Sequence, residues 1–220
     1  ITNSSVDFKV KINGKNERVK TGIPGRFSVY NSLAAISVVS KLGVDAETIK
    51  EALSYSLGSD MHEVWRNSRK REDGTYESRI KKSKDEEWNL AHGTDEVDIA
   101  NCTFEELPSN WQYENLEAGR VAIGLVYEKV LNGEQFTKED IDKMASHIHE
   151  EWLKRNSWVF DSNYGDPKLA VPYNELSQEE KDKDIAQLLP ACSKVEAYKQ
   201  GLINMEELCD KYGIQSGKTL

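Results

Sequence analysis

The sequence has few cysteines, no long apolar run and no excess of positive charge, and each absence excludes a class of protein. Its three cysteines, Cys102, Cys192 and Cys209, are far apart and form no CxxC pair. Neither a disulfide framework nor a thiolate zinc site is therefore indicated. No apolar stretch approaches the roughly 20 residues that span a bilayer, and the sequence leads us to expect no signal peptide. We expect a protein of the reducing cytoplasm with no membrane span.

Negative charge dominates the second part of the sequence. The net charge is −9, with +2 in residues 1–60 and −11 in residues 61–220. Such a surface repels phosphate backbones, so nucleic acid is an unlikely partner. One basic run, from Arg66 to Lys84, departs from this trend, but carboxylates are interleaved with it. A solvated helix or hairpin face is the favoured interpretation of the run, and nucleic-acid binding through residues 66–84 stays an alternative.

The N-terminal part has strand patterns followed by helix patterns. Residues 6–23 alternate on both sides of Asn13-Gly14, which predicts a β-hairpin. Beyond residue 25, apolar residues at helical spacing predict one helix, and Asp45 is placed to cap a second, short one. The sequence thus begins as an α/β fragment.

The character of the sequence changes at residues 58–61, and every tryptophan, cysteine and histidine lies beyond residue 58. A Gly-Ser pair before methionine is what an engineered join leaves, and a natural loop has the same composition. From Met61 onward the pattern is mainly helical, with a hairpin expected over residues 76–82. Capping boxes predict helix starts near Thr103, Thr137 and Ser177, and a last helix is expected over residues 204–211. The predicted fold is mainly α, with segments at 1–57, 58–61 (junction), 62–213 (helical domain) and 214–220 (tail).

The helical part contains an internal repeat. MHEVW at 61–65 recurs as IHEEW at 148–152, and FEELPSNWQYEN at 104–115 aligns without gaps with YNELSQEEKDKD at 173–184. Each copy has a His-Glu-x-Trp helix followed by an aromatic-x-x-Leu turn into an acidic helix. We expect the two copies to bury complementary faces, with His62 and His149 hydrogen-bonded inside their own copies.

The string GRFSVYNSLAA at 25–35, with its surroundings in residues 1–57, resembles the end of the central domain of Mur ligases, of the MurE type. In that family the asparagine that matches Asn31 touches the adenine of ATP, so the resemblance implies an adenine-side position here. The favoured interpretation is that Asn31 only caps a helix and that this position is not functional here. The GxxxxGK[ST] phosphate loop, the magnesium ligands and the carbamylated-lysine region have no counterpart, and phosphoryl transfer then lacks electrostatic support. The expectation leans against an enzyme, with a fragment of an ATP-dependent Mur ligase of peptidoglycan biosynthesis as the alternative.

The helical part is similar to ryanodine-receptor repeat domains, most clearly over residues 144–195. The matching residues are His149, Glu150, Trp152, Val171, Pro172, Tyr173, Leu176, Lys181 and Asp184. This resemblance implies a non-catalytic module that binds an unknown protein or a small-molecule ligand. It is the leading interpretation at this stage.

Aromatic side chains are the candidate ligand-binding residues: Trp65, Trp111, Trp152, Trp158 and Tyr173. Tryptophan joins a large apolar face to one polar donor, which suits a pocket, although anchoring of a core explains the same residues. His147 and His149 point about 200 degrees apart on a helix and cannot chelate one ion there. We therefore predict no metal site, no catalytic residues and no cofactor.

Overall fold

The computed structural model describes residues 6–12, 15–21, 45–163 and 165–215, which form mainly helices. The predicted class, mainly α with a β-hairpin near the N-terminus, is confirmed. The chain divides into two compact units, Ile1–Thr48 with Gln215–Leu220, and Ile49–Ile214. The second unit contains both copies of the sequence repeat.

The described part of the first unit is a two-stranded antiparallel sheet. Strand β1 (Val6–Ile12) pairs with β2 (Lys15–Thr21). Ile12 is opposite Lys15, and this register matches the two-residue loop that an Asn-Gly pair favours. The helix predicted beyond residue 25 and Asn31 lie outside the described residues.

Helix α2 (Ala46–Ser68) crosses the position at which the sequence predicts a junction. The Asp45 carboxylate accepts a hydrogen bond from the Thr48 amide at 2.8 Å, and this bond is the main cause of the lowered pKa of Asp45. The predicted cap is therefore present. The helix then continues through Gly58 and Ser59 without interruption. The two helices predicted on either side of residues 58–61 are one helix, in which Gly58 and Ser59 are buried and Gly58 lies against the backbone of another helix.

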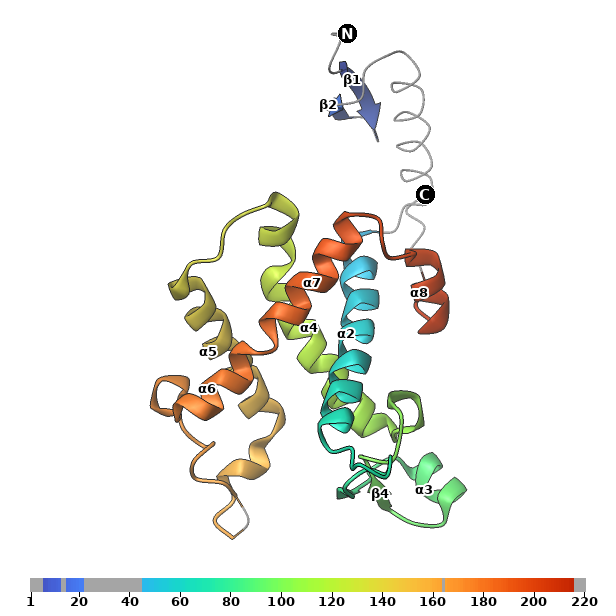
Figure 1. The fold of residues 1–220 in the computed structure, drawn as a ribbon, viewed down its shortest axis with the longest axis vertical. Coiled ribbons are helices and arrows are strands. Elements are labelled where there is room, and N and C mark those ends of the chain that lie inside the picture. The colour runs from blue at the N-terminus through green and yellow to red at the C-terminus, as the bar shows by residue number, and fades with distance from the viewer. Residues whose placement is uncertain (1–5, 13–14, 22–44, 164, 216–220) are drawn as a thin grey trace. The chain divides into compact units, whose positions relative to one another are not determined.

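Helices α2, α4 (Ser109–Asn132) and α7 (Leu188–Lys199) supply much of the core of the second unit. In Figure 1, α7 crosses in front of α4 and α2, and Lys194 of α7 reaches Ser56 of α2 at 2.6 Å. Several large apolar side chains on these helices are fully buried, namely Leu53, Leu57, Ile123, Val126 and Val195. Their burial contributes to the apolar stabilisation of this unit.

Two glycines allow α2 and α4 to approach backbone to backbone. A Cβ built on Gly58 would lie 2.7 Å from the Asn115 carbonyl oxygen. A Cβ on Gly119 would lie even closer to the Ser54 carbonyl oxygen. Gly58 therefore has a packing role inside a helix.

The hairpin predicted over residues 76–82 is wrong. Strand β3 (Ile80–Lys82) pairs antiparallel with β4 (Glu96–Asp98), and helix α3 (Glu86–His92) lies between them in sequence. The Asp98 carboxylate holds this pairing, because it accepts hydrogen bonds from the Arg79 amide and the Ser78 hydroxyl. Tyr76 instead forms an isolated bridge with Lys70.

The predicted helix starts are largely confirmed. Thr137 and Asp140 form a reciprocal capping box at the start of α5 (Lys138–Arg155). Ser177 caps α6 (Gln178–Ile185), and Asn204 caps α8 (Met205–Lys211). The box of Thr103 and Glu106 starts the 3-10 helix η1 (Phe104–Glu106), and α4 begins three residues later. Two further 3-10 helices, η2 (Ser157–Phe160) and η3 (Tyr173–Glu175), connect α5 to α6.

None of the helices in the described residues is long and apolar enough to cross a membrane. Cys102, Cys192 and Cys209 are free.

Candidate ligand pocket

The two copies of the sequence repeat have the same local geometry. The Nε2 atom of His62 on α2 hydrogen-bonds the Cys102 carbonyl at 2.9 Å, and that of His149 on α5 hydrogen-bonds the Val171 carbonyl at 2.8 Å. Each imidazole is 3% exposed. In each copy the carbonyl precedes a 3-10 turn with a buried aromatic and a buried leucine. The prediction that each histidine is hydrogen-bonded within its own copy is confirmed.

The tryptophan of each His-Glu-x-Trp motif stacks on its histidine. The ring centroids are 5.8 Å apart for His62 and Trp65, and 6.0 Å apart for His149 and Trp152. Histidine and tryptophan are three residues apart and thus share a helix face. The motif therefore attaches a loop carbonyl to a helix in both copies, which is a structural role.

The second copy lines a cavity of about 240 Å³ between α5, α6 and the segment before η3. Its walls combine apolar and ionisable side chains, namely His149, Trp152, Leu169, Leu176, Glu180, Lys183, Asp184 and Gln187. We call this cavity the α5–α6 pocket. Trp152 is among the residues predicted from the sequence, but the polar wall is not, because QEEKDKDI has the composition of a solvated helix. The spacing of Glu180, Asp184 and Gln187 at i, i+4 and i+7, one helix face, is the signal that could have revealed it.

Hydrogen bonding fixes the proton on the His149 ring. The Val171 carbonyl is only an acceptor, so Nε2 must donate to it and must bear a hydrogen. In the neutral ring Nδ1 is then an acceptor, and it lies 3.5 Å from Oδ2 of Asp184. The two atoms attract each other only when the imidazole or the carboxyl holds a further proton.

Burial makes Asp184 an unusual carboxyl group. Its side chain is 13% exposed. Desolvation raises its pKa to about 6, the nearby His149 acts in the opposite direction, and Glu180 adds to the rise. Within the described residues no lysine or arginine comes within 4.0 Å of the Asp184 carboxylate, while Lys183 pairs with Glu180 at 2.7 Å. The pocket thus has a carboxylate whose charge is not neutralised by a permanent cation.

The five aromatic residues predicted to bind a ligand do not converge on one pocket. Trp152 lines the α5–α6 pocket. The Trp158 ring packs against the Trp152 ring in a T-shaped arrangement, with the ring centroids 6.4 Å apart. Trp65 lies under the Arg69 guanidinium, and Trp111 donates from Nε1 to the Lys82 carbonyl.

Tyr173 lines a different cavity, of about 590 Å³, beside α5 and α6. Burial is the main cause of the raised pKa of Tyr173, and three surrounding aspartates add to it. Its buried hydroxyl has no hydrogen-bond partner in the described residues.

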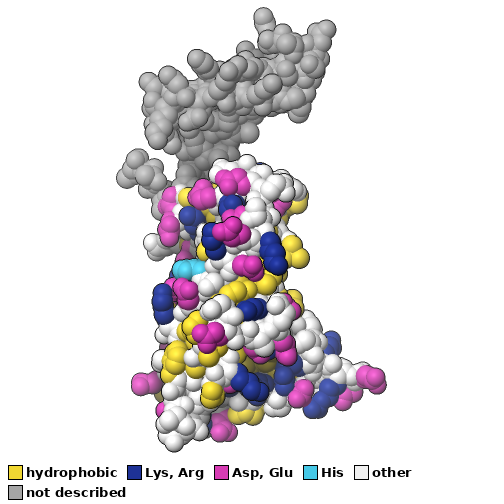
Figure 2. Space-filling model, turned by 90° about the vertical axis from the view of Figure 1, so that its left-hand side faces the viewer, with side chains coloured by type: hydrophobic (Ala, Val, Ile, Leu, Met, Phe, Trp, Pro, Cys, Tyr) yellow, Lys and Arg dark blue, Asp and Glu magenta, His cyan; other side chains and the backbone are white. Residues whose placement is uncertain are grey.

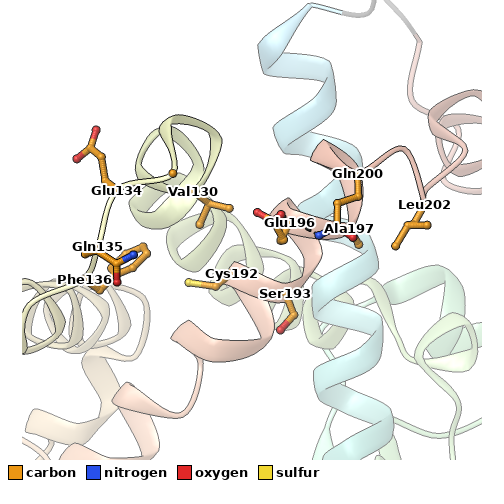
Figure 3. A pocket seen from close by; sticks show the side chains of 11 residues that line it. Val130, Glu134, Gln135, Phe136, Cys192, Ser193, Glu196, Ala197, Gln200 and Leu202 are labelled. Carbon is orange, nitrogen blue, oxygen red and sulfur yellow. Dashed lines mark hydrogen bonds between the residues drawn. The ribbon is translucent and has the colours of Figure 1, made fainter. Parts of the chain in front are cut away.

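A third hollow, of about 620 Å³, lies between the end of α4, the following loop and α7. Figure 3 shows Cys192 and Ser193 on α7, with Phe136 across the hollow and Glu134 directed away from it. Burial raises the pKa of the Cys192 thiol, and the Ser193 hydroxyl donates to the Leu189 carbonyl. Neither side chain is an activated nucleophile, so this hollow offers no chemistry comparable to the α5–α6 pocket.

Three of the eight basic residues at 66–84, Arg66, Arg69 and Lys82, form ion pairs with carboxylates in the structure. Arg66 is buried, donates to the Ala100 carbonyl and pairs with Glu63 at 2.8 Å. Lys82 pairs with Asp95 at 2.8 Å. On the face that bears α5 and α6, acidic and basic side chains are likewise interspersed, with hydrophobic patches between them (Figure 2).

Metal ligands do not cluster in the part of the chain that the structure describes: no three side chains of His, Cys, Asp or Glu converge there. His147 is exposed and lies 4.0 Å from Glu151, whereas His149 is buried.

Comparison with known proteins shows that a segment of about 50 residues is similar to Mur ligases. The diaminopimelate ligase of Caldanaerobacter subterraneus, named UDP-N-acetylmuramoyl-L-alanyl-D-glutamate–2,6-diaminopimelate ligase, is 52% identical over 52 residues, which are 24% of this chain and 11% of the ligase. The UDP-N-acetylmuramate–L-alanine ligase of Caldicellulosiruptor bescii is 47% identical over 55 residues, 24% of this chain and 12% of that protein. A second diaminopimelate ligase, from Clostridium acetobutylicum, is 45% identical over 51 residues, which are 23% of this chain and 11% of that protein. The chain thus spans about a tenth of the length of these relatives.

No family model matches the chain, and no solved structure matches it. The interpretation of residues 62–213 as ryanodine-receptor-type repeats, and as a binding module of that family, is therefore wrong. The structure shows the physical reason. The shared His-Glu-x-Trp and aromatic-x-x-Leu residues attach a turn to a helix, and core packing of this kind does not identify a family.

Proposed function

We propose that this chain contributes the end of the central domain to an ATP-dependent Mur ligase, an enzyme that joins an amino acid to a UDP-N-acetylmuramoyl precursor. The observation that supports this most strongly is the 52% identity over 52 residues to a diaminopimelate ligase. The L-alanine ligases match over a similar length. The identity therefore covers what ligases of different amino acids share, which favours a contribution to nucleotide binding over amino-acid selection.

The composition of the chain limits that contribution. No GxxxxGK[ST] phosphate loop occurs in the 220 residues, so the backbone amides that cradle a triphosphate must come from another part of the ligase. Phosphoryl transfer depends on those amides and on magnesium. We propose that residues 1–57 serve the adenine end of the ATP site and that the phosphate end lies elsewhere.

Asn31 is the residue proposed to contact adenine. A carboxamide offers one acceptor and two donors. These can pair with the adenine amino group and an adjacent ring nitrogen, as asparagine does with adenine in DNA. The catalytic groups proper would belong to the remainder of the ligase, and the cytoplasm, where we propose that the protein works, fits its free cysteines.

A segment exchange tests this proposal. The matching 52-residue segment of the Caldanaerobacter subterraneus ligase is replaced by the corresponding segment of this chain. ATP-dependent addition of 2,6-diaminopimelate to UDP-N-acetylmuramoyl-L-alanyl-D-glutamate is then measured. We expect the hybrid to remain active, and Asn31→Ala to raise the KM for ATP about tenfold, as expected when a buried hydrogen-bonding group is left unpaired.

Ser28→Ala in the same hybrid is the matched control, with little change in KM expected. Thermal unfolding with and without ATP distinguishes a misfolded hybrid from a folded one. A folded hybrid that neither binds ATP nor ligates would overturn the proposal. So would sustained magnesium-dependent ATP turnover by the 220-residue chain alone, because that chain would then need no external phosphate site.

A further inference from the structure

We propose that the α5–α6 pocket binds a small primary ammonium compound with a short apolar tail. This site is independent of the proposed ligase function, since it belongs to the second unit. Three features of the pocket support this proposal. Hydrogen-bond acceptors in the pocket face no donor, and the Asp184 carboxylate has no lysine or arginine partner in the described residues. The rest of the wall is aromatic and aliphatic.

The pocket has acceptors that face no donor. When neither group holds a further proton, Nδ1 of His149 and Oδ2 of Asp184 are two acceptors that face each other at 3.5 Å. Oε1 of Gln187 is buried and has no hydrogen-bond partner in the described part of the chain. A buried acceptor without a donor costs roughly 1–3 kcal/mol. A primary ammonium group has three N–H donors and no acceptor, so it matches this set.

The placement of the acceptors follows from the helix. Asp184 and Gln187 are three residues apart, and the backbone stays in the right-handed helical region through Ala186 and Gln187. Both side chains therefore lie on the same face, toward His149 of α5. A single donor group placed between α5 and α6 can reach both helices.

Charge favours a cation at this position. Lys183 neutralises Glu180 at 2.7 Å and also lies 3.5 Å from Glu179. Asp184 receives no such partner from the lysines and arginines of the described residues. A bound ammonium group would supply the missing positive charge in a desolvated site, where a charge-assisted hydrogen bond is strong.

The apolar wall suits a short carbon chain. Trp152, Leu169 and Leu176 line the same cavity, whose volume is about 240 Å³. The indole face adds a cation–π contribution for an ammonium within about 6 Å. The small volume excludes nucleotides and long peptides.

The first copy of the repeat provides an internal contrast. In the gapless alignment, Asn115 occupies the position of Asp184, Trp111 that of Glu180 and Ala118 that of Gln187. Asn115 uses its amide to donate to the Trp111 carbonyl. The structural motif is shared, but the charged acceptors occur only in the second copy, so the shared architecture does not require them.

Titration of the full chain with n-butylammonium chloride tests the proposal, with the indole N–H of Trp152 and the His149 ring followed by NMR. We expect saturable shifts at these two residues and none with n-butanol or potassium chloride. Asp184→Asn should weaken binding at least about tenfold, the effect of losing a charge-assisted hydrogen bond. Gln187→Met should also weaken it.

Asp182→Asn is the matched control, because Asp182 is an exposed carboxylate on the same helix and lies outside the pocket. It should bind butylammonium as the parent does. Equal shifts with n-butanol, unchanged affinity in Asp184→Asn, or no saturable shift in the parent would each overturn the proposal. Far-UV circular dichroism of every variant confirms that a loss of binding is not a loss of fold.

Discussion

At the scale of single residues, Asp184 should make the stability of the second unit depend on pH. Its pKa is raised from 3.8 to about 6 in the folded chain. The folded state therefore holds this proton more tightly than the unfolded state, and stability is lost as pH rises between about 4 and 6. This rise in the pKa of Asp184 corresponds to about 3 kcal/mol of free energy as an upper figure.

Asp184→Asn should remove the loss of stability that accompanies ionisation of Asp184. The amide keeps the shape of the carboxyl group, bears no charge at any pH, and can donate to Nδ1 of His149 when that nitrogen is unprotonated. We expect the variant to raise the free energy of unfolding by about 1–3 kcal/mol at pH 8 and to leave it nearly unchanged at pH 4. Urea unfolding at both pH values measures the difference, with Asp182→Asn as the exposed control. Equal effects at pH 4 and pH 8 would show that Asp184 does not titrate in this range.

Residue-scale features differ in how far the sequence reveals them. Caps at Thr137, Ser177 and Asn204 could be predicted because a cap and its amide lie within three residues. The spacing on α6 shows that Asp184 shares a helix face with Glu180 and Gln187, but it does not show that α5 packs against that face and buries Asp184. Trp152 was predicted as a site residue for its chemistry, and that assignment stays a prediction.

At the scale of elements, the contact between α2 and α4 depends on glycine. A side chain at Gly58 or Gly119 would meet backbone atoms of the facing helix, which cannot rotate away. Gly58→Ala and Gly119→Ala should each destabilise the chain by about 1–3 kcal/mol, the usual cost of overpacking. Gly119→Ala should have the larger effect because its contact is closer.

Gly124→Ala on α4 is the matched control for these two substitutions. Gly124 is exposed, and nothing lies within 4 Å of an added Cβ. Alanine should there stabilise the helix by up to about 1 kcal/mol. Thermal unfolding of the three variants measures these changes in stability. Stabilisation by all three would mean that α2 and α4 do not approach as closely as described.

The same contact explains why the sequence suggested a junction at residues 58–61. Glycine followed by serine is typical of a loop, and only the backbone of α4 reveals that Gly58 is a packing residue. The pairing of strand β3 was likewise not predictable from local sequence. Its partner β4 lies beyond helix α3, whereas local patterns favour pairing between neighbours.

At the scale of the whole molecule, the unit that folds by itself should begin before α2. The predicted helical domain, residues 62–213, omits Leu53 and Leu57, whose side chains have 0% exposure. It also omits Ser54 and Gly58, and with them both of the close backbone contacts to α4 described above. Residues 45–215 retain all of α2 and its Asp45 cap.

We therefore expect residues 45–215 to unfold cooperatively in urea and residues 62–213 to lack a cooperative transition. Removal of Leu53 and Leu57 alone costs about 2–5 kcal/mol each by the scale of large-to-small core substitutions, which is comparable to the whole stability of a small domain. Far-UV circular dichroism of both fragments measures the transitions. The Asp184→Asn effect at pH 8 should reappear in the longer fragment, because the α5–α6 pocket is complete within it. A cooperative transition of residues 62–213 at the urea midpoint of the longer fragment would show that the first half of α2 is not part of this core.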